Sequence, residues 1–114
     1  MKNNNIEKGD FAEQVAANVL IQKGYAILET KYRTPVGEID IIAKQNEYIV
    51  FVEVKYRKHL AHGLPREAVN QAKQRRIRKA ALYYVASQCG YEVDMRFDVI
   101  EMLREGILHL ENAF

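Results

Sequence analysis

The sequence has little of what stabilises small secreted proteins or membrane proteins. It contains one cysteine, Cys89, so an intramolecular disulfide is excluded and a cysteine-based zinc site lacks its second thiol. Two prolines among 114 residues, with 48% hydrophobic and 28% charged residues, exclude a disordered, collagen-like or low-complexity chain. The amino terminus lacks a signal peptide's apolar segment, and no apolar run reaches the ~18 residues of a membrane helix. We therefore expect one domain over 1–114, away from membranes, in a reducing cytoplasm.

Positive charge is concentrated in one quarter of the chain. Residues 55–79 hold nine of the 17 lysines and arginines and one acid, Glu67, so this segment carries +8. The remainder carries −6, which leaves a net charge of only +2. Such asymmetry is typical of a surface that binds a polyanion, and also of a solvated helix face. Charge alone leaves both interpretations open.

Hydrophobic spacing predicts an α/β fold with a central mixed sheet flanked by helices. Residues 6–23 carry an apolar stripe at helical spacing that includes Phe11, and Gly24 follows as a helix C-cap. A second helical pattern covers 66–88. Mixed polar and apolar residues at 25–32 precede strand patterns at 36–43, 48–56, 93–102 and 107–110. The predicted order is α-β-β-β-α-β-β.

The two central strands place charges where a sheet normally has none. If their hairpin turns symmetrically about residues 46 and 47, Asp40 lies opposite Glu53 and Glu38 lies opposite Lys55. Period-two alternation puts all four on one face, with opposed Cβ atoms about 5 Å apart. Glu38 and Lys55 could form an ordinary ion pair, whereas two opposed carboxylates destabilise a sheet. A shifted register with a solvent-exposed face is the alternative.

Two such carboxylates must share a proton, reach solvent or bind a cation. Mg²⁺ is the obvious candidate because it takes hard oxygen ligands. A metal beside a lysine suggests phosphodiester hydrolysis, because the metal polarises a phosphoryl oxygen and lowers the pKa of bound water. Lys55, on the same strand face as Glu53, can orient that water or stabilise the transition state. Replacing Glu53 by Gln should weaken metal binding and relieve the repulsion on Asp40.

Asp40, followed thirteen residues later by Glu53-Val54-Lys55 and then by a basic helix, resembles the motif of the PD-(D/E)xK nuclease superfamily. The chain also resembles the YraN family of small bacterial proteins, in the blocks GEIDIIA, FVEVKYR, EAV, KQRRI, RFDVI and HLENAF. This resemblance covers nearly the whole chain, from Gly9 to Phe114. The superfamily includes archaeal Holliday junction resolvases. The resemblance implies the restriction-endonuclease-like αβββαβ core, with metal ligation by Asp40 and Glu53 and catalysis by Lys55. Ile39 stands where the superfamily motif has proline.

The resemblance also extends the candidate site beyond the hairpin. Glu13 matches a metal-site glutamate of the first helix in resolvase-like members, although Asp10 and Glu13 also have the spacing of a capping box. Gln74 resembles a helix residue that approaches the active site in related nucleases, or it is an ordinary exposed position. His59 and His62 are weak evidence for zinc. The predicted nucleic-acid-binding residues are Arg57, Lys58, Lys73, Gln74, Arg75, Arg76 and Lys79.

The leading hypothesis is a Mg²⁺- or Mn²⁺-dependent DNA endonuclease that acts on branched or damaged DNA. Resolvase-like relatives cut as dimers, which suggests a homodimer by analogy. A nucleic-acid-binding module without catalysis is the rival hypothesis, but a pure binder gains nothing from opposed carboxylates. A small-molecule phosphoesterase is disfavoured because a charge of +8 exceeds what one phosphate requires.

Overall fold

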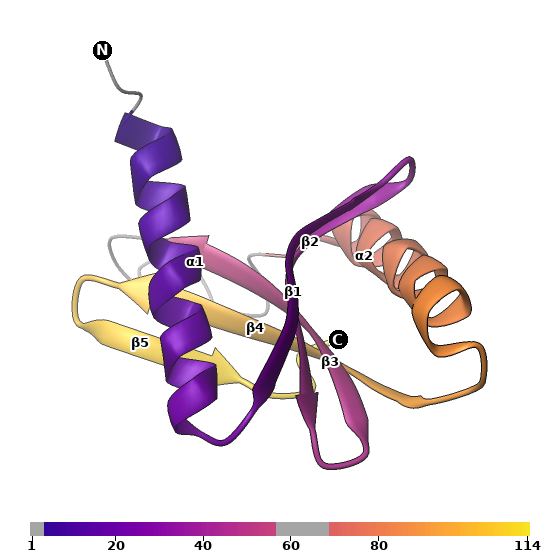
Figure 1. Ribbon diagram of the computed structural model, residues 1–114. Helices are drawn as coiled ribbons and strands as arrows, with labels where there is room; N and C mark the ends of the chain where they lie inside the picture. Colours follow the sequence, from indigo (N-terminus) through magenta and orange to yellow (C-terminus); the bar gives the residue numbers. More distant parts are fainter. Residues whose placement is uncertain (1–3, 57–68) are drawn as a thin grey trace.

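The part of the chain that the computed structural model describes, residues 4–56 and 69–114, forms a five-stranded sheet with one helix packed on each face (Figure 1). The strands lie in chain order, with β3 and β4 parallel and the other neighbours antiparallel. The elements are α1 (Asn4–Gln22), β1 (Ala26–Thr34), β2 (Gly37–Gln45), β3 (Tyr48–Tyr56), α2 (Gln71–Tyr84), β4 (Asp94–Leu103) and β5 (Gly106–Leu110). This confirms the predicted α/β class and has the order of the restriction-endonuclease-like core. No helix in these ranges is long and apolar enough to cross a membrane.

The β2–β3 hairpin has the register that the sequence predicts. Gln45 pairs with Tyr48 and Ile41 pairs with Val52, so the turn is centred on residues 46 and 47. Asn46 has a φ of 52°, in the left-handed region that two-residue hairpin turns require and that asparagine tolerates. The turn therefore determines which residues of β2 and β3 share a face.

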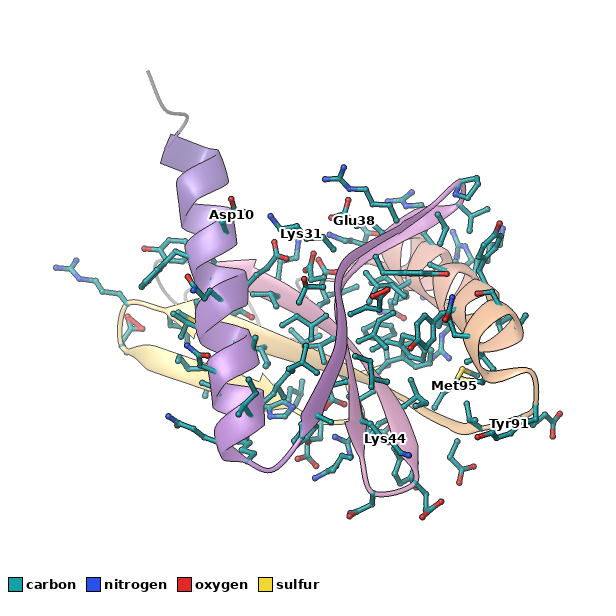
Figure 2. All side chains as sticks on the ribbon, in the orientation of Figure 1. Asp10, Lys31, Glu38, Lys44, Tyr91 and Met95 are labelled. Carbon is teal, nitrogen blue, oxygen red and sulfur yellow. The ribbon has the colours of Figure 1, made fainter. Side chains whose placement is uncertain are left out.

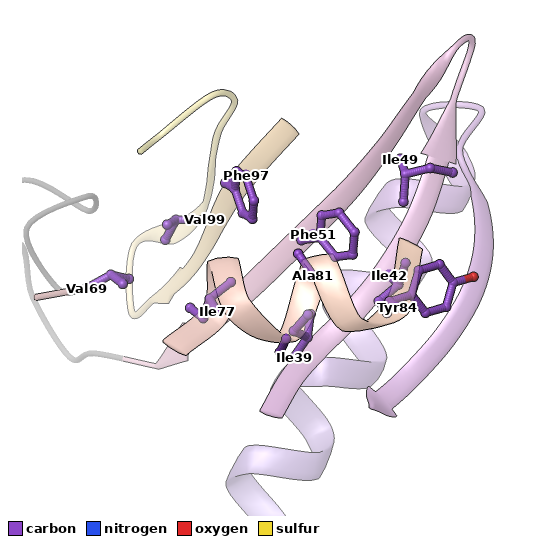
Figure 3. Close-up of a cluster of buried hydrophobic side chains, with 11 residues drawn as sticks. Ile39, Ile42, Ile49, Phe51, Val69, Ile77, Ala81, Tyr84, Phe97 and Val99 are labelled. Carbon is purple, nitrogen blue, oxygen red and sulfur yellow. The ribbon is translucent and has the colours of Figure 1, made fainter. Parts of the chain in front are cut away.

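The alternating strands supply two separate apolar cores, one beneath each helix. Ala16 and Leu20 of α1 pack on Ile41, Val50 and Val52. Strand β3 is buried on both faces, as expected for a central strand of a sheet covered on both sides. The core beneath α2 is shown in Figure 3 and contains Ile39, Ile42, Ile49, Phe51, Val69, Ile77, Ala80, Ala81, Tyr84, Phe97 and Val99.

Two details of the helices differ from the sequence-based expectation. Phe11 lies outside the buried stripe of α1 and is 60% exposed; from residue 10 onwards the buried residues of this helix are Ala12, Ala16 and Leu20. Helix α2 begins at Gln71, because the Asn70 side chain accepts a hydrogen bond from the backbone N–H of Lys73 at 2.8 Å and caps the helix. Residues 66–68 of the predicted helix lie outside the described residues. The start of α2 therefore places Lys73 in its first turn. Gly24, with a φ of 93°, follows α1 as predicted.

A buried carboxylate attaches the end of the chain to the sheet. Asp98 of β4 has no exposed surface and accepts two hydrogen bonds at 2.9 Å from the Arg96 guanidinium. It also lies 2.8 Å from His109 Nε2 and accepts the Asn112 backbone N–H at 3.0 Å. Burial alone would raise the pKa of Asp98, but these bonds from His109, Arg96 and Asn112 outweigh it and lower the pKa. Asp98 is thus a structural residue.

Candidate functional site

A hollow forms where β2 leaves β3. Beyond Ile41 the β2–β3 pairing is replaced by a side-chain contact, in which Asp40 Oδ2 accepts the Val54 backbone N–H at 2.8 Å. Strand β2 continues its pairing with β1 as far as Gly37, and the end of this ribbon passes over α2 (Figure 1). A Cβ atom at residue 37 would lie only 3.1 Å from the Arg76 carbonyl oxygen, so glycine permits this close approach. The hollow of about 290 Å³ is lined by Gly37, Glu38, Asp40, Glu53, Lys73, Arg76 and Ile77.

The two carboxylates of the predicted site lie together in this hollow. Glu53 is 4% exposed, and Asp40 is partly buried beside it. Burial and the nearby Glu53 charge raise the pKa of Asp40 to about 7, despite the Val54 hydrogen bond that lowers it. Asp40 and Glu53 therefore form a site in which negative charge is unfavourable until a cation balances it.

Lys73 of α2 supplies one positive charge directly. Its Nζ lies 2.6 Å from Glu53 Oε1, and the Lys73 side chain is 33% exposed. Burial lowers the pKa of Lys73, but the hydrogen bond and charge of Glu53 outweigh it, so the pKa is raised. From the sequence, Lys73 is predicted to bind nucleic acid, and its contact with Glu53 was not predicted. The signal was available, because Lys73 lies one helical turn before the buried Ile77 and so faces the sheet.

Lys55 lies near Lys73 and Glu53, and Glu38 lines the hollow without pairing with Lys55. Burial first and the Lys73 charge second lower the pKa of Lys55. The expected Glu38–Lys55 pairing is wrong, because β2 has turned towards β1 at this point. Glu38 lies opposite Arg33, with its Oε2 3.4 Å from Arg33 Nε, and both side chains are well exposed. The β3–β4 register instead places Lys55 beside the buried Glu101, which the sequence analysis did not single out.

Glu13 approaches the site from α1. Burial raises its pKa, Lys31 lowers it, and Asp10, Glu38 and Glu53 raise it further. Asp10 pairs with Lys31, and Figure 2 shows these two residues and Glu38 along one edge of the molecule. The capping-box interpretation is wrong because α1 begins at Asn4, so Asp10 and Glu13 lie inside the helix.

Glu13 does not complete a three-carboxylate group. Within residues 4–56 and 69–114, no three His, Cys, Asp or Glu side chains gather as they would around a metal ion. One oxygen of Glu13, Oε1, is nevertheless buried without a hydrogen-bond partner. The metal role of Glu13 stays a prediction, as do the roles of Asp40, Glu53 and Lys55.

The basic helix presents only some of its charges to solvent. Arg75, Arg76, Arg78 and Lys79 are exposed, and Lys73 is only partly so. The exposed Arg78 guanidinium also lies over the Phe97 ring at 4.8 Å and the Phe114 ring at 5.7 Å. Gln74 donates its side-chain N–H to the Val69 carbonyl at 2.9 Å. Tyr84 is buried and Tyr83 is 52% exposed. The predicted positions Arg57, Lys58, His59 and His62 lie outside the described residues.

The site combines oxygen donors with ammonium groups. Asp40 and Glu53 can offer hard anionic oxygens to a divalent cation, and Lys55, Lys73 and Arg76 can balance an incoming anion. The two groups of charges meet where the exposed basic stripe of α2 reaches the hollow. Such an arrangement can hold a cation and a phosphate side by side.

Comparison with known proteins places this chain in a family. The model of the uncharacterised protein family UPF0102 matches residues 12–102. A UPF0102 protein of Clostridioides difficile is 49% identical, over 97% of this chain and 99% of the relative. Relatives from Thermodesulfovibrio yellowstonii and Lachnoclostridium phytofermentans are 49% and 47% identical, and they cover 96% and 94% of this chain and 96% and 92% of their own lengths. The chain therefore belongs to UPF0102, the YraN family, as its sequence blocks predicted.

Proposed function

We propose that this protein is a Mg²⁺- or Mn²⁺-dependent DNA endonuclease that acts on branched or damaged DNA. The observation that carries the proposal is the placement of Asp40 and Glu53 in one hollow, beside two lysines and below a basic helix. A purely structural hairpin has no use for two adjacent carboxylates, one of which is mostly buried.

The residues present fit a divalent cation. Mg²⁺ is typically held by one or two carboxylates and keeps several waters, so Asp40 and Glu53 would suffice. The buried Glu13 Oε1 without a hydrogen-bond partner is a further oxygen on the α1 side of the site. When bound, the cation would supply Lewis-acid chemistry, polarising a phosphoryl oxygen and lowering the pKa of a water.

The chain's own groups would bind the phosphate and stabilise charge. The ammonium of Lys55, which is partly buried beside Glu53, would face the developing charge of the phosphorane or orient the attacking water. Arg76 lines the hollow from α2 and would bind a neighbouring phosphate. These groups act where water is partly excluded, which strengthens their electrostatic effect.

The choice of a nucleic acid follows from the exposed stripe on α2. Arg75, Arg76 and Lys79 offer more positive charge than a single phosphate monoester requires, and Arg76 connects this stripe to the hollow. Tyr83 lies exposed one turn beyond Lys79, where a base could stack. A homodimer and a cytoplasmic location remain predictions.

One observation favours a second candidate, a nucleic-acid-binding module without cleavage. Lys73 Nζ lies 2.6 Å from Glu53 Oε1 and neutralises that carboxylate from within the chain, as expected in a site that does not use a cation. A module of this kind would use α2 to bind phosphates and would not respond to Mg²⁺. The two candidates therefore differ in their metal dependence.

A cleavage assay distinguishes them. Purified protein is incubated with Mg²⁺, Mn²⁺ or EDTA and end-labelled duplex, single-stranded, flap and four-way DNA. Lys55→Met keeps most of the apolar stem and deletes the charge, so cleavage should fall at least ~10²-fold with DNA binding largely retained. Lys44→Met, which changes an exposed lysine of β2 away from the hollow, is the matched control and should cut like the wild type.

Asp40→Asn, purified in parallel, tests whether cleavage comes from a contaminating nuclease. Activity that survives in this variant does not arise from the proposed site. If the wild type binds DNA and cuts none of these substrates with either metal, the endonuclease proposal is wrong and the binding-module candidate stands.

A further inference from the structure

We propose that the Lys73 ammonium is the resident cation of the Asp40–Glu53 site and that a divalent cation must displace it from Glu53. This inference rests on the proposed function in one respect, that the site takes a divalent cation. It adds a competition within the chain, which sets the metal concentration at which the site becomes occupied.

The start of helix α2 fixes the position from which Lys73 contacts Glu53. The Asn70 cap accepts the Lys73 backbone N–H at 2.8 Å, so the residue is held in the first turn of α2. From there its side chain crosses to β3, where Nζ lies 2.6 Å from Glu53 Oε1. Glu53 is 4% exposed, so its charge cannot be balanced by bulk water.

The ammonium and a divalent cation compete for the same carboxylate. An ammonium nitrogen 2.6 Å from Glu53 Oε1 occupies the approach to that oxygen, while Mg²⁺ requires about 2.1 Å. A divalent ion next to Lys73 would also face an unscreened positive charge at close range. Lys55 lies near Lys73 as well, so the site already holds two ammonium groups for two carboxylates.

The Lys73 side chain can move away from Glu53 while helix α2 stays folded. Its side chain is 33% exposed and lines the same hollow as Arg76. A rotation about its side-chain bonds would carry the ammonium from Glu53 towards solvent while the Asn70 cap stays in place. The displaced ammonium would then point towards solvent at the mouth of the hollow, where it could meet an incoming anion.

The test measures Mn²⁺ binding to the whole chain without DNA, through the loss of the free-ion EPR signal at pH 8 and constant ionic strength. Lys73→Gln removes the charge and keeps an N–H donor for Glu53, so the fold should be retained. We expect Mn²⁺ affinity to rise at least ~10-fold in Lys73→Gln, because one repelling charge is removed. Lys44→Gln, which deletes an exposed lysine elsewhere, should bind Mn²⁺ like the wild type.

Lys73→Met is the second variant and must show the same gain. If the wild type binds Mn²⁺ and both Lys73 variants bind it equally or more weakly, the inference is overturned and the metal site stands. If the wild type and both variants fail to bind Mn²⁺ at millimolar concentration, the proposed metal-dependent function fails together with the inference. Binding that appears only in the Lys73 variants supports the inference most directly.

Discussion

Asp40→Asn should stabilise the metal-free protein above neutral pH. The substitution removes one of two adjacent negative charges and keeps the shape of the side chain. Its Oδ1 can still accept the Val54 backbone N–H that Asp40 Oδ2 accepts at 2.8 Å. Glu53 remains paired with Lys73, so the substitution leaves no buried charge without a partner. The result therefore reports the cost of ionising Asp40 in the empty site.

The size and sign of the effect follow from the pKa of Asp40. Burial and the Glu53 charge raise it from 3.8 in the unfolded chain to about 7 in the folded protein. Each pKa unit corresponds to 1.36 kcal/mol, so ionised Asp40 costs at most about 4 kcal/mol of folding free energy. The pKa is raised, so this cost is absent below pH ~4, grows as the pH rises to ~7, and is complete above it. Relaxation and water entry reduce it, and we expect a gain of about 1–3 kcal/mol at pH 8.

The assay is urea unfolding in EDTA at pH 8 and at pH 4.5, followed by circular dichroism. The gain in Asp40→Asn should be largest at pH 8 and fall to about a quarter of that at pH 4.5, because pH 4.5 lies only just above the unfolded pKa of 3.8. Glu38→Gln is the control, because it removes an exposed carboxylate of the same strand that pairs with Arg33. Its effect should stay within about 0.5 kcal/mol. Equal or lower stability of Asp40→Asn at pH 8 would show that the two carboxylates do not repel each other.

Three further predictions concern other parts of the structure. Glu53→Gln should abolish most Mn²⁺ binding and lower the stability of the metal-free fold by about 1 kcal/mol at pH 4.5, where Asp40 is mostly protonated in the folded protein and Lys73 loses its partner; urea unfolding that shows a gain at this pH would contradict this. Asp98→Asn should cost about 3 kcal/mol in the same assay, since it breaks an ion pair whose carboxylate is fully buried. An unchanged unfolding midpoint would show that the Asp98 charge does not stabilise the fold. Alanine at both Arg75 and Arg76 should weaken binding to all duplex sequences alike and flatten the log–log salt dependence by about 0.9 per lost phosphate contact. An unchanged slope in fluorescence anisotropy would place the DNA surface elsewhere.

Local patterns in the sequence were sufficient for the fold and for the centre of the site. Strand alternation has a period of two, so once the turn at 46–47 is recognised the pairing of β2 with β3 follows residue by residue. The last pair is Ile41 with Val52, so Asp40 and Glu53, one residue beyond it, could be predicted from the sequence to lie close together. The stripe of α1 was located as well, although Phe11 was assigned to its buried side. These features depend on neighbours within one hairpin or one helix.

Only the tertiary structure decided the partners of the charged side chains. Lys73 meets Glu53 because α2 crosses the sheet face over β3, a geometry that depends on both cores. Glu38 pairs with Arg33 and not with Lys55, because β2 leaves β3 and follows β1. Asp98 shares its strand face with Arg96, but it gathers His109 and the Asn112 backbone from positions that no periodicity connects to it. Backbone pairing is set by short-range repeats, whereas an ion pair forms wherever packing brings opposite charges together in a place that water cannot balance.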